Sequence, residues 1–397
     1  TTFNQDASIN GGSDKFRYMF SYAGINSQEI MLGSEYSRDN FSLKLDHKPN
    51  SKISLSYSLR YSDTKIYGAG ATDQGGATPN DSRVKQCMIY VPVPISSLGD
   101  YEDEELSSMI YPLDAVKDND RQQLRKRYNM GASLSWELLN NLEFKTEGGL
   151  DYNVNNDDRY YGLSTYYVRN TPSALYQNKP ALESTERKSV GVRNTNTLTY
   201  DLDQFLGETG HSLKLLAGQE MIITRSNTMF NQVWGYPDFF TSSQAYNLVS
   251  QGFSNSYTNT YNPDDKLLSF FGRVNYDYKG KYLLTLTYRA DGSSKFLKGN
   301  QWGYFPSAAL AWRISDEKFM EGLSSTVDNL KLRLSYGTAG NNNIPSNQIA
   351  QLFQTGASAW ISGFSSYLSP SKTMANPKLK WETTYTRNIG LDFGLFR

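Results

Sequence analysis

Cysteine and histidine are nearly absent from this chain of 397 residues. Cys87 is its single cysteine, and His47 and His211 are its two histidines. One cysteine forms no intrachain disulfide and no cysteine-based metal site. The histidines stand in no HExxH or HxH spacing, and no nucleophile pattern surrounds them. We therefore interpret both histidines as structural residues and expect neither a catalytic site, nor a cofactor, nor enzyme activity.

Long hydrophobic runs and net charge are also missing. No window holds 18 uncharged apolar residues, which excludes a transmembrane helix. The 40 basic side chains are balanced by 40 acidic ones, whereas a nucleic-acid-binding domain normally carries a basic excess. Apolar residues make up only 38% of the chain, yet aromatic residues reach 14%, too many for an acidic disordered protein. This composition suits strands that are apolar on one face only.

Apolar and polar residues alternate with a period of two, which is the pattern of a half-buried β-strand. Residues 53–61 read Ile-Ser-Leu-Ser-Tyr-Ser-Leu-Arg-Tyr, and residues 281–289 and 329–336 alternate in the same way. Successive side chains of a strand point to opposite faces, so each segment has one apolar and one polar face. The best helix candidate is the short stretch Asp316–Leu323. The pattern predicts about 13 strands, over residues 4–12, 16–29, 36–48, 53–66, 122–139, 142–162, 186–206, 211–232, 266–278, 281–296, 302–315, 329–340 and 380–396.

The connections between these strands alternate between short and long along the chain, so the short ones fall at one end of the predicted sheet and the long ones at the other. Turns rich in Gly, Asn, Asp and Pro are short, at 13–15, 49–52, 140–141, 207–210 and 279–280. Long stretches lie between them, at 67–121, 163–185, 233–265 and 341–379. Short periplasmic turns and long extracellular loops are typical of an outer-membrane β-barrel, whereas a soluble sandwich has shorter strands and no such sorting. We predict an all-β, membrane-spanning, antiparallel up-and-down β-barrel in the cell outer membrane.

The two ends of the sequence lead to a further expectation. The sequence starts Thr1-Thr-Phe-Asn4, with no basic segment and no apolar segment, so we expect no signal peptide at this start. The first and the last predicted strands both run toward the short turns. A barrel with both termini in the periplasm begins with a strand of the opposite direction, so we expect at least one strand before Thr1. Residues 1–397 are interpreted as one partial barrel domain.

Seven segments, following one another along the chain, resemble the SusC/RagA-type family of TonB-dependent outer-membrane transporters. The resemblance implies a 22-stranded barrel with an N-terminal plug, of which this chain supplies about strands 2–14. The plug, the TonB box, the first strand and the C-terminal strands would lie outside this sequence. One departure is Ile30, where members of the family often have Gly. The segments are Asn10-Gly-Gly-Ser-Asp-Lys15, Ser269-Phe-Phe-Gly-Arg-Val-Asn-Tyr276, Arg289-Ala-Asp-Gly-Ser-Ser-Lys-Phe296, Trp302-Gly-Tyr-Phe-Pro-Ser307, Ala311-Trp-Arg-Ile314, Leu334-Ser-Tyr-Gly-Thr-Ala-Gly-Asn-Asn342 and Asn376-Pro-Lys-Leu-Lys-Trp-Glu-Thr383.

The resemblance also implies a function. An oligosaccharide or a peptide would be imported across the outer membrane, with energy from a TonB complex that contacts the absent N-terminal part. A SusD-like lipoprotein would cover the outer loops, and outer-membrane lipids and lipopolysaccharide would surround the barrel. The alternative is a passive porin or an adhesin-type barrel without TonB coupling. A plug domain and a TonB box upstream in the same gene would discriminate between the two.

Charged clusters fall in or near the predicted long loops. Residues 102–105 are all acidic, and acidic pairs occur at 157–158 and 264–265. Oxygen-rich loops can bind Ca²⁺, but no EF-hand spacing is present, so solvated charge is the simpler interpretation. The basic residues Arg121 and 125–127 would attract phosphorylated lipid headgroups or line the lumen.

Aromatic and charged residues are assigned by their place on strands or loops. Strand aromatics are predicted on the lipid face or in the girdles at the bilayer interfaces: Tyr57, Tyr61, Tyr282, Tyr288, Trp312, Trp381 and Tyr385. Loop aromatics are candidates for substrate or partner contact, and equally for packing of the loops themselves: Trp234, Tyr236, Phe239, Phe240, Trp360 and Phe364. Polar strand residues are expected in the lumen, opposite a lipid face that holds Leu284 and Leu332: Lys281, Arg289, Lys331, Arg333 and Asp392.

Overall fold

The computed structural model describes residues 1–68, 81–91, 109–323, 326–345, 348–351, 353–358, 365–370 and 374–396. Its strands are β1 (Thr2–Gly12), β2 (Phe16–Gln28), β3 (Glu35–Asn50), β4 (Ile53–Tyr67), β5 (Asn119–Leu139), β6 (Leu142–Tyr161), β7 (Ala181–Asp201), β8 (His211–Trp234), β9 (Phe253–Tyr261), β10 (Asp265–Tyr278), β11 (Tyr282–Ser293), β12 (Trp302–Arg313), β13 (Val327–Asn341), β14 (Phe353–Ser358), β15 (Ser365–Pro370) and β16 (Glu382–Leu395).

The helices in these ranges are short, and none is long and apolar enough to cross a membrane. The α-helices are α1 (Arg83–Ile89), α3 (Pro112–Asp118), α4 (Tyr166–Arg169), α5 (Asp203–Leu206) and α6 (Ser242–Asn247). The 3-10 helices are η3 (Gly207–Thr209), η4 (Val249–Gln251), η5 (Ile314–Asp316) and η6 (Lys318–Leu323).

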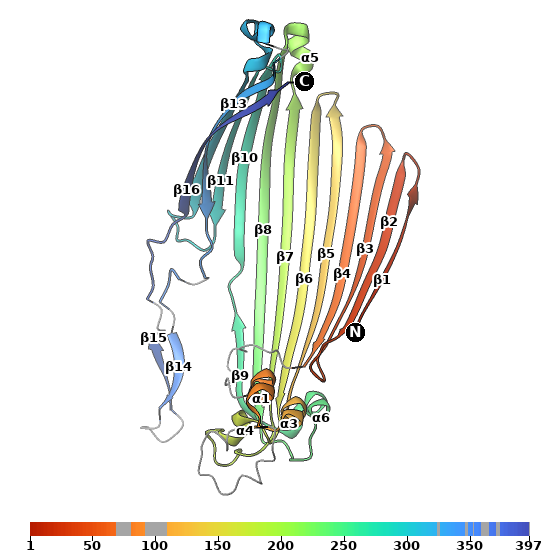
Figure 1. Cartoon of the computed structure of the whole chain (residues 1–397). Coiled ribbons are helices and arrows are strands. Elements are labelled where there is room, and N and C mark those ends of the chain that lie inside the picture. The colour runs from red at the N-terminus through yellow and green to blue at the C-terminus, as the bar shows by residue number, and fades with distance from the viewer. Residues whose placement is uncertain are drawn as a thin grey trace.

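Fourteen strands form one antiparallel sheet. Its hydrogen-bonded order is β1-β2-β3-β4-β5-β6-β7-β8-β10-β11-β12-β13-β16, and β9 also pairs with β8. Figure 1 shows this sheet as a tall curved wall, with the short turns at one end and the long connections at the other. The chain ends with β16 at the short-turn end. The order confirms the predicted up-and-down fold, and its path contains the thirteen predicted strands.

Strand length and turn chemistry both suit a membrane wall. β8 has 24 residues and β5 and β7 have 21 each, whereas about 9–11 tilted residues cross a bilayer. The central strands therefore extend well beyond the membrane. In the turn between β10 and β11, Lys279 and Gly280 both have positive φ, at 53° and 66°. Such a turn has the twist of a two-residue hairpin, which keeps adjacent strands paired up to the turn.

The predicted loop 233–265 is wrong in part, because it contains β9. β9 pairs with Asn227–Trp234 of β8, beyond the stretch of β8 that pairs with β10. β9 and β10 are therefore two parts of one strand, interrupted between Tyr261 and Asp265. The sequence of β9, Phe-Ser-Asn-Ser-Tyr-Thr-Asn-Thr-Tyr, has an aromatic residue only at every fourth position. Alternation of period two does not detect it, because asparagines separate the aromatic residues on one face and the other face holds only Ser and Thr.

Two further connections also differ from the prediction. The strand predicted over 186–206 ends at Asp201, and the following residues form α5. The Asp203 carboxylate accepts hydrogen bonds from the Leu213 N–H and the Ser212 hydroxyl, at 2.9 and 3.0 Å, and so closes this turn. The predicted loop 341–379 contains a separate two-stranded sheet of β14 and β15. The helix predicted at Asp316–Leu323 is present as the 3-10 helix η6.

A packed hydrophobic core lies at the long-loop end of β6, β7 and β8. One cluster is Tyr160, Leu182, Val233, Tyr236 and Ala245. The adjoining cluster is Tyr161, Val168, Ala181 and Trp234. Figure 1 shows α1, α3, α4 and α6 gathered at this end. We call residues 81–91, 109–118, 162–180 and 235–252, with the strand ends beneath them, the loop platform.

Candidate functional site

The register of the sheet assigns each strand residue to one of two faces. Residues that are partners across an antiparallel pair share a face. From Leu59 on β4, this relation leads through Met130, Leu150 and Val192 to Ile223 on β8. We call this apolar side the lipid face and the opposite, polar side the lumen face. The wall therefore offers a hydrophobic surface to the bilayer and a hydrophilic surface to a solute.

The predicted facing of individual residues agrees with this register. Leu284 is paired with Leu310 on the lipid face, and Leu332 shares that face through its partner Trp312. The charged residues Arg289, Lys331, Arg333 and Asp392 occupy the alternate positions and lie on the lumen face. Lys281 is a turn residue rather than a wall residue, and its Nζ lies 3.4 Å from Oε2 of Glu317.

Two rows of aromatic rings run across the lipid face. The loop-side row joins Tyr22, Phe41, Tyr61, Tyr128 and Tyr152 on β2 to β6, with neighbouring centroids 5.0, 6.2, 4.7 and 6.0 Å apart. The turn-side row joins His211, Tyr278, Tyr282 and Trp312, with centroids 4.5, 6.2 and 6.4 Å apart. On β4, the residues from 53 to 61 separate the turn from the loop-side row. That span equals the roughly 9–11 residues that cross a bilayer, so the short turns and the loop-side row have the separation of the two bilayer interfaces.

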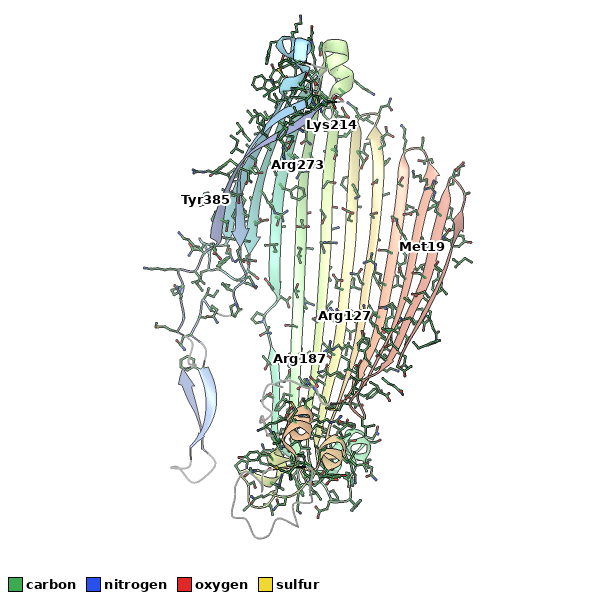
Figure 2. All side chains as sticks on the ribbon, in the orientation of Figure 1. Met19, Arg127, Arg187, Lys214, Arg273 and Tyr385 are labelled. Carbon is green, nitrogen blue, oxygen red and sulfur yellow. The ribbon has the colours of Figure 1, made fainter. Side chains whose placement is uncertain are left out.

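The strand aromatics predicted for the lipid face or girdles are placed as follows. Tyr61 belongs to the loop-side row, and Tyr282 and Trp312 belong to the turn-side row. Tyr57 and Tyr288 lie between these rows, and Tyr385 lies on the same face of β16. Figure 2 shows Tyr385 on this outermost strand. Contact of these rings with lipid stays a prediction.

Trp381 has a different place. It precedes β16, and its indole Nε1 donates a hydrogen bond to the carbonyl oxygen of Gln301 at 2.8 Å. Its ring packs against Phe296 and Phe305, with centroids 5.7 and 5.4 Å away. Phe305 lies on the lumen face because its register partner is Arg289. Trp381 therefore fixes the chain before β16 to the inner side of the wall.

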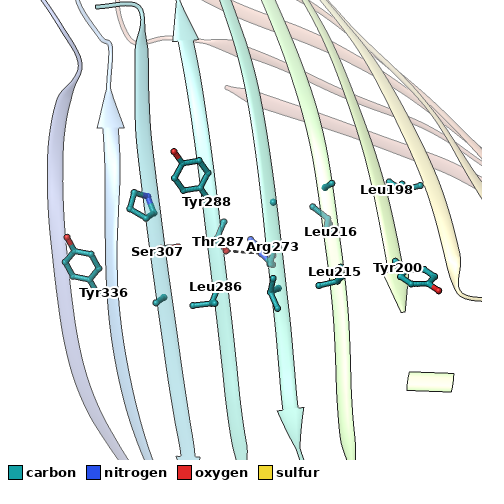
Figure 3. Close-up of a pocket in the computed structure, with 15 residues that line it drawn as sticks. Leu198, Tyr200, Leu215, Leu216, Arg273, Leu286, Thr287, Tyr288, Ser307 and Tyr336 are labelled. Atoms are coloured by element: carbon teal, nitrogen blue, oxygen red, sulfur yellow. Dashed lines mark hydrogen bonds between the residues drawn. The ribbon is translucent and has the colours of Figure 1, made fainter. Parts of the chain in front are cut away.

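A hollow of about 660 Å³ lies on the lipid face (Figure 3). Small residues on its floor leave the space: Ala217, Gly272, Pro306 and Ala308. Larger side chains surround it, among them Leu198, Tyr200, Leu215, Leu286, Tyr288 and Tyr336. A hydrophilic nutrient loses its hydration in such a site and gains almost no polar partner. We therefore assign the hollow to lipid acyl chains and place the candidate substrate path on the lumen face.

Most of the described loop aromatics pack inside the loop platform. Trp234 is 9% exposed and Tyr236 is fully buried. The Trp234 Nε1 donates to the Tyr167 hydroxyl at 3.2 Å, and the Tyr236 hydroxyl donates to the carbonyl of Val249 at 3.2 Å. Burial raises the pKa of Tyr236 to about 12. This phenol stays neutral, as its apolar surroundings require.

Phe239 and Phe240 are neighbours with different surroundings. Phe240 packs on the platform core, and its carbonyl accepts a hydrogen bond from the Tyr160 hydroxyl at 2.6 Å. Phe239 is 75% exposed and is accessible to a substrate or a partner. Trp360 and Phe364 lie outside the described residues. Packing therefore accounts for Trp234, Tyr236 and Phe240, while contact of any loop aromatic with substrate or partner stays a prediction.

A polar network that sequence reasoning missed holds the loop platform together. Arg83 is 1% exposed, and its guanidinium donates to the carbonyl oxygens of Val116 and Asn119 at 2.6 and 2.8 Å. Its Nη2 also lies 3.6 Å from Oδ1 of Asp120. Burial lowers the pKa of Arg83 below its ordinary value. No motif marks this arginine, because its partners become neighbours only in the folded chain.

Asp81 joins two loops that are far apart in the sequence. Its buried carboxylate accepts hydrogen bonds from the backbone N–H groups of Tyr166 and Tyr167, at 2.6 and 2.9 Å. These groups belong to the first turn of α4, where backbone donors have no partner inside the helix. The connection fixes the long loop after β4 to the loop after β6.

Acidic residues were considered for Ca²⁺ binding. Within the described ranges, no three His, Cys, Asp or Glu side chains gather as metal ligands. The Asp157 carboxylate is held by two hydrogen bonds from Arg121, both 2.7 Å, and Asp264 pairs with Arg225 at 3.0 Å. The acidic run 102–105 lies outside the described residues. Ca²⁺ binding stays a prediction.

Known proteins share both sequence and fold with this chain. A family model described as TonB dependent receptor-like, beta-barrel, matches residues 91–397. TonB-dependent receptor P3 of Formosa agariphila is 27% identical over 99% of this chain and 38% of its own length. TonB-dependent receptor SusC of Bacteroides thetaiotaomicron is 43% identical over 137 residues, which are 34% of this chain and 14% of that protein.

Solved structures repeat the same architecture. The RagAB peptide importer in its open-open state superposes with a TM-score of 0.78 at 21% identity, over 100% of this chain and 42% of that chain. This chain thus spans about two fifths of the length of P3 and of that importer chain. The SusC match and the RagAB fold confirm the resemblance to the SusC/RagA type. The chain belongs to the TonB-dependent receptor β-barrel family, whose members lie in the outer membrane.

Proposed function

We propose that this chain forms part of the wall of a TonB-dependent importer of oligosaccharides or peptides. The supporting observation is a continuous sheet that is apolar on one face and polar on the other. In lipid, every backbone polar group needs a partner within the protein, and the paired strands supply one. The polar face then gives a hydrophilic solute a path through the hydrocarbon layer.

Energy coupling and substrate class rest on the relatives. The curated relatives are named TonB-dependent receptors, and the RagAB structures are named as a peptide importer. A TonB complex would act through the N-terminal part of the protein. Resemblance to SusC extends the substrate class to oligosaccharides.

Uptake by cells tests the coupling. The full-length gene is expressed with and without its TonB box, and entry of a labelled oligosaccharide or peptide mixture is followed. We expect uptake to fall to background without the TonB box, while the amount of folded barrel in the outer membrane stays unchanged. Equal uptake by both forms would instead identify a passive porin or an adhesin-type barrel.

The loop platform is the proposed contact surface of a SusD-like lipoprotein. Phe239 projects from a rigid, packed base and is 75% exposed, which suits a partner surface. We expect Phe239→Ala to reduce co-purification of the lipoprotein several-fold. Phe205→Ala is a matched control, because Phe205 is 68% exposed in α5 at the opposite end of the wall. Equal losses in both variants would contradict this assignment.

A further inference from the structure

Arginines recur on the lumen face of β3 to β8, in the half nearer the loop platform. One cross-strand row reads Arg38, Thr64, Arg125, Asn155, Arg187 and Thr228, each residue being the register partner of the next. The row therefore holds an arginine on every second strand. Neighbouring strands lie about 4.8 Å apart, so these arginines are spaced by about 10 Å along the wall.

The two adjacent rows add one arginine each. The second row reads Asn40, Ser62, Arg127, Asn153, Ser189 and Ser226. The third row reads Ser42, Arg60, Asn129, Asp151, Gly191 and Thr224. Figure 2 places Arg127 and Arg187 in the platform-side half of the wall. We call Arg38, Arg60, Arg125, Arg127 and Arg187 the arginine patch.

The arginine patch has positive charge that the wall does not neutralise. None of the ion pairs found among the described residues includes a patch arginine. Asp151 is the one carboxylate in the three rows, and it accepts a hydrogen bond from Asn129. The Nε of Arg125 is buried and has no hydrogen-bond partner in the described part of the chain. Arg38 and Arg125 also donate hydrogen bonds to neutral neighbours, Asn40, Ser62 and Gln123, which leave their charge in place. Guanidiniums that face one space without a carboxylate partner attract an anion into it.

The side chains around the arginines point to a hydroxylated ligand. Besides the arginines and Asp151, the three rows contain only Asn, Ser, Thr and one Gly, so they include no apolar side chain. Amides and hydroxyls both donate and accept hydrogen bonds, which suits the hydroxyl groups of a sugar. A peptide would bring apolar side chains that find no partner here. Guanidiniums bind carboxylate and sulfate groups through paired hydrogen bonds.

We propose that the arginine patch binds an acidic oligosaccharide, a sugar chain with carboxylate or sulfate groups, on its way through the lumen. The proposal rests on the import function above and specifies its substrate class. The repeated spacing of Arg38, Arg125 and Arg187 matches a polymer whose charges recur along its length. The patch lies on the wall between the loop platform and the short turns, where it would draw an acidic chain inward from the loops.

Binding to the purified full-length transporter tests the proposal. The probes are an oligogalacturonate, a sulfated oligosaccharide, a neutral malto-oligosaccharide and an oligoglutamate, all of similar length. The variant is Arg125→Gln/Arg187→Gln. The matched control is Lys145→Gln/Lys214→Gln, which removes the same charge from the same face, where both lysines have carboxylate partners at 2.9 Å. Figure 2 shows Lys214 near the short-turn end.

We expect at least one acidic oligosaccharide to bind the native protein at least tenfold more tightly than the neutral one. Each of the two substitutions in the Arg125→Gln/Arg187→Gln variant should contribute about a tenfold loss of affinity, since a hydrogen bond to a charged group is worth roughly that factor. The control pair should change it less than twofold, and added salt should weaken the native complex. Relative affinities for the first two probes separate carboxylate from sulfate.

Three results would overturn the proposal. The first is equal affinity for acidic and neutral sugars. The second is tighter binding of oligoglutamate than of either acidic sugar, which indicates an acidic peptide. The third is unchanged sugar binding in the patch variant together with faster proteolysis of the plug, which indicates that the arginines hold the plug. If the cells take up neutral sugars in a TonB-dependent way but do not take up acidic ones, the proposed import function stands and the proposed acidic substrate is wrong.

Discussion

The two ends of the lumen face handle charge in different ways. Toward the short turns, cations have carboxylate partners: Lys44 with Asp46 at 3.4 Å, and Lys214 with Asp201 at 2.9 Å. Toward the loop platform, the patch arginines have none among the described residues. Several cations near the short turns are thus neutralised by the wall, whereas the patch arginines are not, although Arg121 beside the patch pairs with Asp157. An end that must bind a ligand keeps unpaired groups, whereas an end that must only be stable does not.

The largest expected effect comes from breaking the platform that covers the arginine end. Arg83→Met removes a buried guanidinium that holds two carbonyl oxygens and pairs with Asp120. Each buried carbonyl oxygen left without its donor costs about 1–3 kcal/mol. We expect hydrogen exchange in residues 81–91 and 109–118 to accelerate by two orders of magnitude or more. Arg127→Met is the control, and equal protection in the two variants would contradict a structural role for Arg83.

We expect a rise in pH to loosen the loop platform through ionisation of the Tyr236 phenol. The pKa of this phenol in the folded protein is about 12, above its ordinary value of 10, so the folded state favours the neutral form. The resulting stabilisation, about 2–3 kcal/mol, is complete below pH 10 and is lost as pH rises through 12. Protease cleavage within residues 235–252 should increase over that range. Tyr236→Phe should remove this pH dependence, and a persisting dependence would assign it to another group.

A carboxylate introduced beside the arginine patch should neutralise it, so that both ends of the lumen face would then carry paired charges. Ser62→Asp places a carboxylate opposite Arg127, at a hydroxyl that already accepts a 3.2 Å hydrogen bond from Nε of Arg38. We expect affinity for the acidic oligosaccharide to fall about tenfold, since the new carboxylate competes for the guanidiniums. Ser62→Asn keeps the shape without the charge and should bind as the native protein does. Equal affinity in both variants would show that the ligand does not use this part of the wall.

The smallest effect is expected at an existing pair near the short turns. Arg333 lies 2.6 Å from Asp392, with side chains 56% and 39% exposed. Exposed ion pairs contribute about 0.2–1 kcal/mol, so Arg333→Gln should lower stability by less than 1 kcal/mol. Arg127→Gln should cost nothing, because no pair is broken. The midpoint of heat-modifiable gel migration measures both, and a larger loss for Arg127→Gln would reverse the comparison.

Sequence reasoning succeeded where a local period carries the information. Alternation in segments such as 53–61 and 329–336 predicted the strands and correctly separated Leu284 and Leu332 from Arg289 and Arg333. It failed for β9, where aromatic residues recur only at every fourth position. It also put Trp381 among the lipid-facing rings, although this residue precedes β16 and packs toward Phe296 and Phe305. Neither periodicity nor composition records which way a residue turns outside a strand.

The sequence by itself determined the strand path and the two faces of the wall, because a pleated strand sends alternate side chains to opposite sides. Tertiary structure alone decided the register, and register places Arg38, Arg125 and Arg187 in one row although they come from strands far apart in the chain. It also decided the contacts of Asp81 and Arg83, since loops without a period take their shape from packing. Local geometry fixes the direction of a side chain, but long-range pairing fixes its neighbours.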